Sequence, residues 1–322
     1  MNSIRQFVEE YYRHFNAGQV RDAARAYVRH IDAGGRMFLS LAGAMSTAEL
    51  GRILARAIRA GLVHGISCTG ANLEEDAFRL IGGPGYHWIP EWQTLSPERE
   101  RAMYDGGINR VTDTGIPEQV MTEVEDELLV RWEAAANSGR SAFPVDFMLD
   151  VLRDPNVRAR FHDPDASWLL AADEMGIPIW TPGWEDSSTG NAFAAAVMRG
   201  DVASHACVRP GTEAMSTLVR WYMEHCDPEP GIGFFQIGGG IAGDFAICVT
   251  PLILKELQLE DTPVWSYFCQ ITDANATYGG YSGAPPNEKI TWGKVLENTP
   301  RFTINSDATI VAPLVLSYAL DS

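Results

Sequence analysis

The stretch Arg36–Ile81, "RMFLSLAGAMSTAELGRILARAIRAGLVHGISCTGANLEEDAFRLI", decides the fold of this chain. It opens with an apolar run that ends at Gly43, which is typical of a buried strand. The next segment has helical spacing, and we expect Ser46 to cap it, Glu49 to complete a capping box and Gly61 to end it. A second apolar run and a second helical segment follow. This order predicts parallel strands joined by right-handed crossovers.

The alternation continues to the end of the chain. Further helices are predicted near 5–15, 20–31, 117–139, 189–200, 212–226 and 308–320, and further strands near 177–183, 231–237, 264–274 and 301–307. The Gly- and Pro-rich segment 82–118 is predicted to be a long ordered loop, a kind of segment that often carries function. We therefore expect an α/β fold: a single domain over 1–322 with a doubly wound, mostly parallel, Rossmann-like sheet and helices on both faces. Residues 1–34 should form a helical segment packed on it.

Composition narrows the classes of function. The formal net charge of -17 argues against a nucleic-acid binder, which needs a basic face, and suits either a cationic substrate or simple solubility. No apolar run reaches about 18 residues, so no membrane span is expected, and the N-terminus lacks the apolar region of a signal peptide. The five cysteines are scattered and odd in number, which predicts reduced thiols, a cytoplasmic location and no metal site.

A glycine turn marks a candidate cofactor site. The segment Gly238–Gly243, "GGGIAG", fits the GxGxxG pattern, follows an apolar strand and opens a helix. Backbone N–H groups at such a turn can approach a pyrophosphate closely. Tight packing between strand and helix explains the same glycines equally well.

Acidic and aromatic residues recur after successive predicted strands. Ligands of α/β sheets bind at these strand ends, and carboxylates with aromatic faces suit a polyamine. Each position alone is better explained as a helix cap or a solvated side chain, but their recurrence favours a site. The candidates are Glu74, Glu75, Trp184, Glu185, Asp186, Asp244, Asp273, Tyr278, Tyr281, Glu288, Trp292 and Asp307.

Lysine is scarce in this chain. Of 25 basic residues only Lys255, Lys289 and Lys294 are lysines, and the rest are arginines. Because a buried lysine can lose its proton and attack carbon whereas arginine cannot, Lys294 is a candidate nucleophile. Chance placement on a solvated face is the competing explanation. Lys289 is expected to be replaceable by arginine with little effect.

Several motifs together resemble the deoxyhypusine synthase family, and most closely its deoxyhypusine synthase-like members, which include homospermidine synthases. The resemblance rests on "TWGK" at 291–294, "DATIVAPL" at 307–314, "TGANLEED" at 69–76, "GINRVTDTGIPE" at 107–118 and the glycine turn. It covers the chain from about Arg36 to its end.

The resemblance implies an NAD-dependent homotetramer that oxidises spermidine, captures the aminobutyl group on a lysine as an imine and passes it to an acceptor amine. It assigns Lys294 as that lysine, which must be neutral to attack. The implied substrate-binding positions are Glu74, Glu75, Asn191, Asp244, Tyr281, Ser282, Glu288 and Trp292. The implied NAD-binding positions are Gly43, Ala44, Met45, Ser46, Thr47, Thr69, Gly70, Ala71, Asp186, Gly239, Asp273, Ala274, Asp307 and Ala308.

Three positions depart from the family pattern. Asp244 stands where the family has a histidine, and Asn191 and Tyr278 stand where it has acids. Because these changes fall in the amine pocket, the sequence favours aminobutyl transfer between small polyamines, with putrescine as acceptor and homospermidine as product. The alternatives are a true deoxyhypusine synthase acting on a protein lysine, an inactive NAD-binding regulatory homologue, and a simple dehydrogenase.

Overall fold

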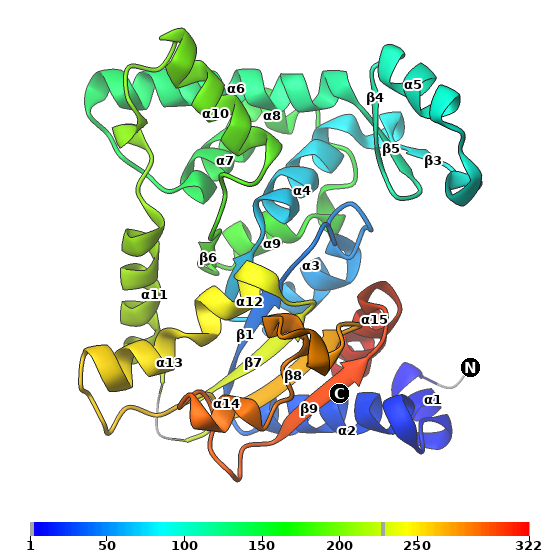
Figure 1. Ribbon diagram of the computed structural model, residues 1–322, viewed down its shortest axis with the longest axis vertical. Helices are drawn as coiled ribbons and strands as arrows, with labels where there is room; N and C mark the ends of the chain where they lie inside the picture. The colour runs from blue at the N-terminus through cyan, green and yellow to red at the C-terminus, as the bar shows by residue number, and fades with distance from the viewer. Residues whose placement is uncertain (1–2, 227–228, 322) are drawn as a thin grey trace.

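Six parallel strands form the central sheet in the order β6-β2-β1-β7-β8-β9 (Figure 1). The computed structural model describes residues 3–226 and 229–321. The strands of this sheet are β1 Arg36–Leu41, β2 Gly65–Cys68, β6 Ile179–Trp180, β7 Ile232–Ile237, β8 Tyr267–Thr272 and β9 Arg301–Asn305. The α-helices are α1 Ile4–Tyr11, α2 Phe15–Asp32, α3 Gly51–Arg59, α4 Gly70–Gly82, α5 Pro97–Asp105, α6 Glu118–Ser138, α7 Pro144–Arg153, α8 Pro155–Arg158, α9 Trp168–Glu174, α10 Ser188–Arg199, α11 Gly211–His225, α12 Gly240–Ile247, α13 Val249–Pro251, α14 Glu288–Thr291 and α15 Ala308–Leu320.

Helices cover both faces of the sheet, as the sequence predicts. Successive strand side chains point to opposite faces, so Met37 and Leu39 of β1 join one hydrophobic cluster while Phe38 joins the other. The first cluster includes residues of α2, α3 and α15, and the second includes residues of α11, α12 and α13 (Figure 1). Because both faces are buried, the strands are apolar almost throughout.

The strand order reverses between β1 and β7. Strand β1 pairs in parallel with β2 on one side and with β7 on the other, and the chain extends the sheet outward from this pair in both directions. The connections diverge here, which leaves a crevice at the carboxyl ends of β1 and β7. This topological switch point is where a ligand site is expected.

The prediction that residues 82–118 form a long loop is wrong in large part. It contains α5 and three short strands, β3 His87–Trp88, β4 Ile108–Val111 and β5 Thr114–Pro117, which form a separate antiparallel sheet. Figure 1 shows this sheet and α5 beyond the end of α6, away from the central strands. Strands of two to four residues leave too little alternation to be recognised among so many Gly and Pro residues.

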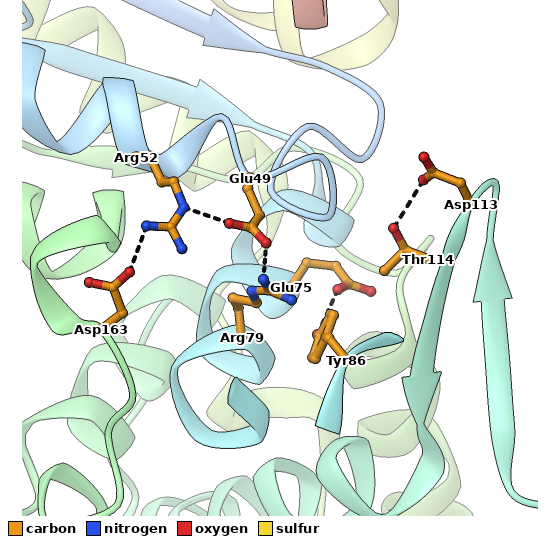
Figure 2. Close-up of polar contacts among 8 residues, drawn as sticks. All are labelled: Glu49, Arg52, Glu75, Arg79, Tyr86, Asp113, Thr114 and Asp163. Carbon is orange, nitrogen blue, oxygen red and sulfur yellow. Dashed lines mark hydrogen bonds and ion pairs between the residues drawn. The ribbon is translucent and has the colours of Figure 1, made fainter. Parts of the chain in front are cut away.

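The predicted start of α3 is also wrong. The helix begins at Gly51, and Ser46 is instead buried, where its hydroxyl donates to the Asn72 carbonyl and accepts from Trp168 Nε1. Glu49 has a φ of 57° and pairs with arginines rather than closing a capping box (Figure 2). The contacts of Ser46 with distant segments outweigh the local capping preference, which explains why the pattern misleads here.

The structure bears on the state of the cysteines and on the expected lack of a membrane span. All five cysteines are free, and three of them are buried. In the part of the chain that the structure describes, none of the helices has both the length and the hydropathy that a bilayer crossing requires.

Candidate active site

A cavity of about 520 Å³ opens at the carboxyl ends of five neighbouring strands. Its walls come from the segments that follow β2, β1, β7, β8 and β9, so it lies over the switch point. It is lined by Ala42, Gly43, Met45, Thr69, Gly238, Gly239, Gly240, Ile241, Ile271, Thr272, Asp273, Ser306, Asp307 and Ala308. Seven of the predicted cofactor positions are in this lining, namely Gly43, Met45, Thr69, Gly239, Asp273, Asp307 and Ala308.

The glycine turn forms one wall of the cavity, between β7 and α12. Gly238 and Gly240 have φ values of 79° and 59°, a region that glycine adopts far more easily than other residues. A side chain on Gly239 would overlap Ser282. The turn therefore needs glycine for its backbone path and for close packing, and it also leads into the N-terminus of a helix, where an anion is stabilised.

The loop after β1 forms the opposite wall, and Asn72 holds it in place. Its side-chain amide donates to the carbonyls of Leu41, Ala42 and Gly43, and Thr69 Oγ1 also donates to Gly43, at 2.7 Å. The sequence did not single out Asn72, although it lies within "TGANLEED". With carboxylates available from Asp273 and Asp307, the cavity suits the pyrophosphate and ribose groups of a dinucleotide.

The other predicted cofactor residues are not part of the lining of this cavity. Ala274 contributes to an adjoining hollow that shares Asp273 and Asp307. Ser46 and Thr47 are buried in the loop after β1, and Asp186 is exposed in the loop after β6. Gly70 packs tightly against Ser187. Ala44 and Ala71 complete this set.

Lys294 lies buried behind the glycine turn. Lys294 comes shortly after the short helix α14 in the chain. Gly293, with a φ of 69°, lets the backbone turn inward just before the lysine. Lys294 is 6% exposed. Its Nζ atom lies 5.5 Å from the centre of the Tyr281 ring and 5.9 Å from that of Trp292. Aromatic faces of this kind favour a cation or an amine-bearing chain.

Asp244 of α12 is the charged partner of Lys294. The Nζ atom of Lys294 lies 3.3 Å from Oδ1 of Asp244, and the aspartate side chain is about half exposed. Cys248, one turn further along the chain, donates its thiol to the same oxygen at 3.4 Å. Burial raises the pKa of the Cys248 thiol, so this side chain stays protonated and does not compete as a nucleophile.

Tyr281 and Ser282 connect the lysine to the cavity. The Tyr281 hydroxyl donates to Gln236 Oε1 at 2.6 Å, and the Gln236 amide donates to the Gly238 carbonyl. Ser282 Oγ accepts from the Gly240 N–H at 3.0 Å. The lysine site and the glycine turn are therefore built from the same few side chains. Gln236 is a residue that the sequence reasoning missed, because it lies inside an apolar strand.

Lys289 is buried as well. Its side chain is 3% exposed, and its Nζ atom lies 4.6 Å from the centre of the Phe268 ring and 5.2 Å from that of Tyr281. Burial, reinforced by the nearby charge of Lys294, lowers the pKa of Lys289 to about 8. Lys255 is the exposed lysine of the three.

The residues predicted to bind the amine substrate separate into two groups. Asp244, Tyr281, Ser282 and Trp292 lie at Lys294 or beside it, and Glu288 is exposed on α14. Glu74, Glu75 and Asn191 belong to α4 and α10, and none of the contacts of the described residues joins them to Lys294.

The Glu74 carboxylate forms hydrogen bonds with the start of α10. Its carboxylate is buried and accepts the backbone N–H groups of Ser188 and Thr189 as well as the Thr189 hydroxyl, which caps the start of α10. All of these partners belong to the protein. The structure therefore gives Glu74 a structural role within one chain.

Glu75 has fewer hydrogen-bond partners than Glu74. It accepts a hydrogen bond from the Tyr86 hydroxyl at 3.0 Å (Figure 2). Burial is the main reason that the pKa of Glu75 is raised to about 7, with the Glu74 charge adding to it. A cationic ligand at this carboxylate would favour its ionised form.

Asn191 lines a second cavity, of about 540 Å³, between α6 and α10. Glu118, Glu125 and Asp126 line the same cavity, and burial raises the pKa of Glu125 to about 7. Asn191 itself donates to the Ser187 carbonyl. Tyr278, the third position that departs from the family pattern, is 82% exposed.

The chain is similar over nearly its whole length to proteins of one family. The family model for deoxyhypusine synthase matches residues 6–319. A deoxyhypusine synthase-like protein from Cyanothece sp. is 30% identical, covering 99% of this chain and 79% of its own length. A Methanosarcina mazei protein named "Probable deoxyhypusine synthase 1" is 27% identical over 94% of this chain and 86% of its own length. A crystal structure from Entamoeba histolytica, assigned as a deoxyhypusine synthase, has a TM-score of 0.60 at 12% identity, covering 100% of this chain and 94% of its own, which shows the shared fold.

Proposed function

We propose that this chain, which belongs to the deoxyhypusine synthase family, is an NAD-dependent aminobutyl transferase that acts on polyamines through a covalent imine on Lys294. The observation that carries the proposal is the ion pair between the buried Lys294 and the half-exposed Asp244, whose helix α12 begins at the glycine turn of the strand-end cavity. The donor is spermidine or a related amine, and the acceptor is a small amine such as putrescine.

NAD would be held by the glycine turn, by the loop after β1 and by the carboxylates of Asp273 and Asp307. When bound, it would supply a two-electron acceptor that takes a hydride from the donor and later returns it. The described residues form no group of His, Cys, Asp and Glu side chains that could hold a metal ion.

Lys294 would act as the nucleophile toward the oxidised donor. The ammonium would first give a proton to Asp244, whose oxygen is 3.3 Å away. The free amine would form a bond to the electrophilic carbon, while the bond from that carbon to the departing diamine breaks and the diamine takes up a proton. An acceptor amine would then displace the Lys294 amine, which frees the lysine and leaves the aminobutyl group on the acceptor as an imine. Addition of the returned hydride and a proton would convert this imine into the product amine.

The aromatic and polar neighbours of Lys294 would position the donor. The Tyr281 and Trp292 rings can pack against methylene groups and cations, and Ser282 lies between the lysine and the turn. The carboxylate of Asp244 in place of a histidine supports a small cationic substrate, because it adds negative charge where the donor amine would bind.

Incubation with NAD, spermidine and putrescine, followed by mass spectrometry of the amines, tests this proposal. We expect homospermidine in wild-type reactions and in a Lys255→Arg control, and none in Lys294→Arg, where charge is kept but nucleophilicity is lost. Net accumulation of NADH without a new polyamine would contradict transfer and indicate a dehydrogenase. Absence of both, with NAD still bound, would indicate a regulatory homologue.

A second function is modification of a protein lysine, as in deoxyhypusine synthase. The names of the archaeal relatives favour it. Spermidine labelled in its aminobutyl group, offered with a candidate acceptor protein and putrescine together, distinguishes the two: label in the protein supports this second function, and label in a small amine supports the first.

A further inference from the structure

We propose that Gln236 and Gln270 are positioning residues that tie the segment Tyr281–Gly283 to the glycine turn, so that a dinucleotide seated at this turn also stabilises the Tyr281 ring beside Lys294. The inference rests on the proposed function in so far as NAD and an amine are the two ligands. It predicts that each ligand strengthens the binding of the other, which can be measured without turnover.

The two glutamines are neighbours in the central sheet. Gln236 of β7 and Gln270 of β8 lie opposite each other in the parallel register, and both are fully buried in largely apolar strands. A buried amide group destabilises a fold unless its hydrogen bonds are made. Among the described residues Gln270 Oε1 has no hydrogen-bond partner. The stability of the sheet alone therefore does not explain why a glutamine stands at this position.

Gln236 bridges the glycine turn and the Tyr281 ring. Its Oε1 atom accepts from the Tyr281 hydroxyl at 2.6 Å, and its Nε2 atom donates to the Gly238 carbonyl at 2.9 Å. Helix α12 packs directly on this bridge, because a Cβ atom on Gly243 would lie 2.8 Å from Gln236 Oε1 and 3.0 Å from Tyr281 Cε1. The next residue, Asp244, carries the carboxylate of the ion pair. A displacement of the glycine turn would therefore move both the ring and the carboxylate of the lysine site.

Gln270 and Ser282 make a second connection between the same parts. Gln270 Nε2 donates to the Ser282 carbonyl at 2.7 Å, while Ser282 Oγ accepts from the Gly240 N–H at 3.0 Å. The packing is close, because a side chain on Gly239 would overlap Ser282. A ligand that orders the glycine turn therefore leaves less of this segment for a second ligand to order. Such sharing gives positive coupling even without a change of shape.

Calorimetric titration measures the coupling. Spermidine is titrated into the protein alone and into the protein saturated with NADH, a pair in which the donor cannot be oxidised because the cofactor already carries the hydride. We expect NADH to raise the affinity for spermidine about tenfold in the wild type. Gln236→Met keeps the size of the side chain but removes both hydrogen bonds, and it should reduce this factor to about twofold or less. Tyr281→Phe should do the same.

A double variant and a control separate positioning from folding. Because Gln236 and Tyr281 act through one hydrogen bond, the variant with both Gln236→Met and Tyr281→Phe should lose no more coupling than either single change. Thr250→Val removes a buried hydroxyl of α13 that has no hydrogen-bond partner among the described residues, and it should keep the wild-type factor. A purely structural role would lower the thermal stability of the variants and leave the factor unchanged.

Hydrogen exchange tests the same link with no amine present. The N–H groups of Gly283 and Ala284 donate to the carbonyls of Gly280 and Tyr281, both at 3.1 Å. Their exchange rates report how well this segment is ordered. Binding of NAD should slow this exchange by about tenfold in the wild type. Gln270→Met should remove the protection.

Unchanged exchange at Gly283 and Ala284 when NAD is bound would overturn the inference, and so would a wild-type coupling factor in Gln236→Met. If Gln236→Met does not fold, Tyr281→Phe, which keeps the ring, still decides. Coupling and protection in a protein that transfers no aminobutyl group would refute the proposed function while leaving the inference intact. Absence of NAD binding would contradict both.

Discussion

The Nζ atom of Lys294 lies 3.3 Å from Oδ1 of Asp244, and the two residues come from the segments on either side of β8. The lysine is almost fully buried, while the aspartate is about half exposed. This ion pair stabilises the resting ammonium and provides an acceptor for its proton. Both effects determine when Lys294 can act as a nucleophile.

Asp244→Asn should slow aminobutyl transfer by about a hundredfold. The carboxylate oxygen lies 3.3 Å from Nζ of Lys294, and an amide in its place cannot take up the proton of the ammonium. Mass spectrometry of the amine products, sampled over time, measures the rate. Asp261→Asn, an exposed acid outside the site, is the matched control. An undiminished rate in Asp244→Asn would show that Asp244 is not the proton acceptor.

Lys289→Met should stabilise the fold at pH 7. The folded-state pKa of Lys289 is about 8, below its ordinary value of 10.5, so between these values the unfolded chain binds the extra proton and stability rises with pH. Below pH 8 the full cost of burying the charge is present, and methionine removes it. Urea unfolding should show a gain of roughly 1–3 kcal/mol at pH 7 that shrinks by pH 9.5. Lys255→Met should change neither value, and a loss of stability in Lys289→Met would argue for a packing role.

Gly239→Ala should weaken NAD binding by about tenfold or more. The added methyl group would overlap Ser282, so either the turn or the segment Tyr281–Gly283 must move. Calorimetric titration with NAD measures the affinity. Gly211→Ala is the control, because open space surrounds Gly211 and its φ is not positive. Equal affinities in both variants would place NAD elsewhere.

Amine binding at Glu75 should release protons. Its pKa is raised to about 7, so the carboxyl is about half protonated at pH 7, and a cationic ligand would ionise it and release about half a proton. Calorimetry in two buffers of different ionisation enthalpy counts these protons. The release should disappear in Glu75→Gln and persist in Glu125→Gln. The opposite result would assign the amine to the α6–α10 cavity, where the pKa of Glu125 is also about 7.

The parallel sheet could be predicted from sequence because its signal is local. The run Arg36–Ile81 has long apolar strands and a helix of clear period, and the structure has the predicted strand, helix, strand and helix. The small sheet of β3, β4 and β5 could not be predicted in the same way. Its strands are too short to show alternation. Strands β4 and β5 form a local hairpin, but β3 pairs with β5 across the whole of α5 and β4.

The candidate site was only partly predictable, for a related reason. The glycine turn and Lys294 are recognisable as short motifs in the chain. The burial of Lys289, however, depends on Phe268 from β8 and Tyr281 from a separate turn, which meet only in the folded protein. Gln236 gave no signal within its apolar strand, although it connects Tyr281 to the glycine turn.

The covalent role of Lys294 is the central claim, and borohydride trapping tests it most directly. The protein would be incubated with NAD and spermidine, reduced, digested and mapped by mass spectrometry. We predict an aminobutyl adduct on Lys294 and none on Lys289 or Lys255, with no adduct when NAD is omitted. Turnover of spermidine to a new amine with no adduct on Lys294, or with full activity in Lys294→Arg, would contradict the account.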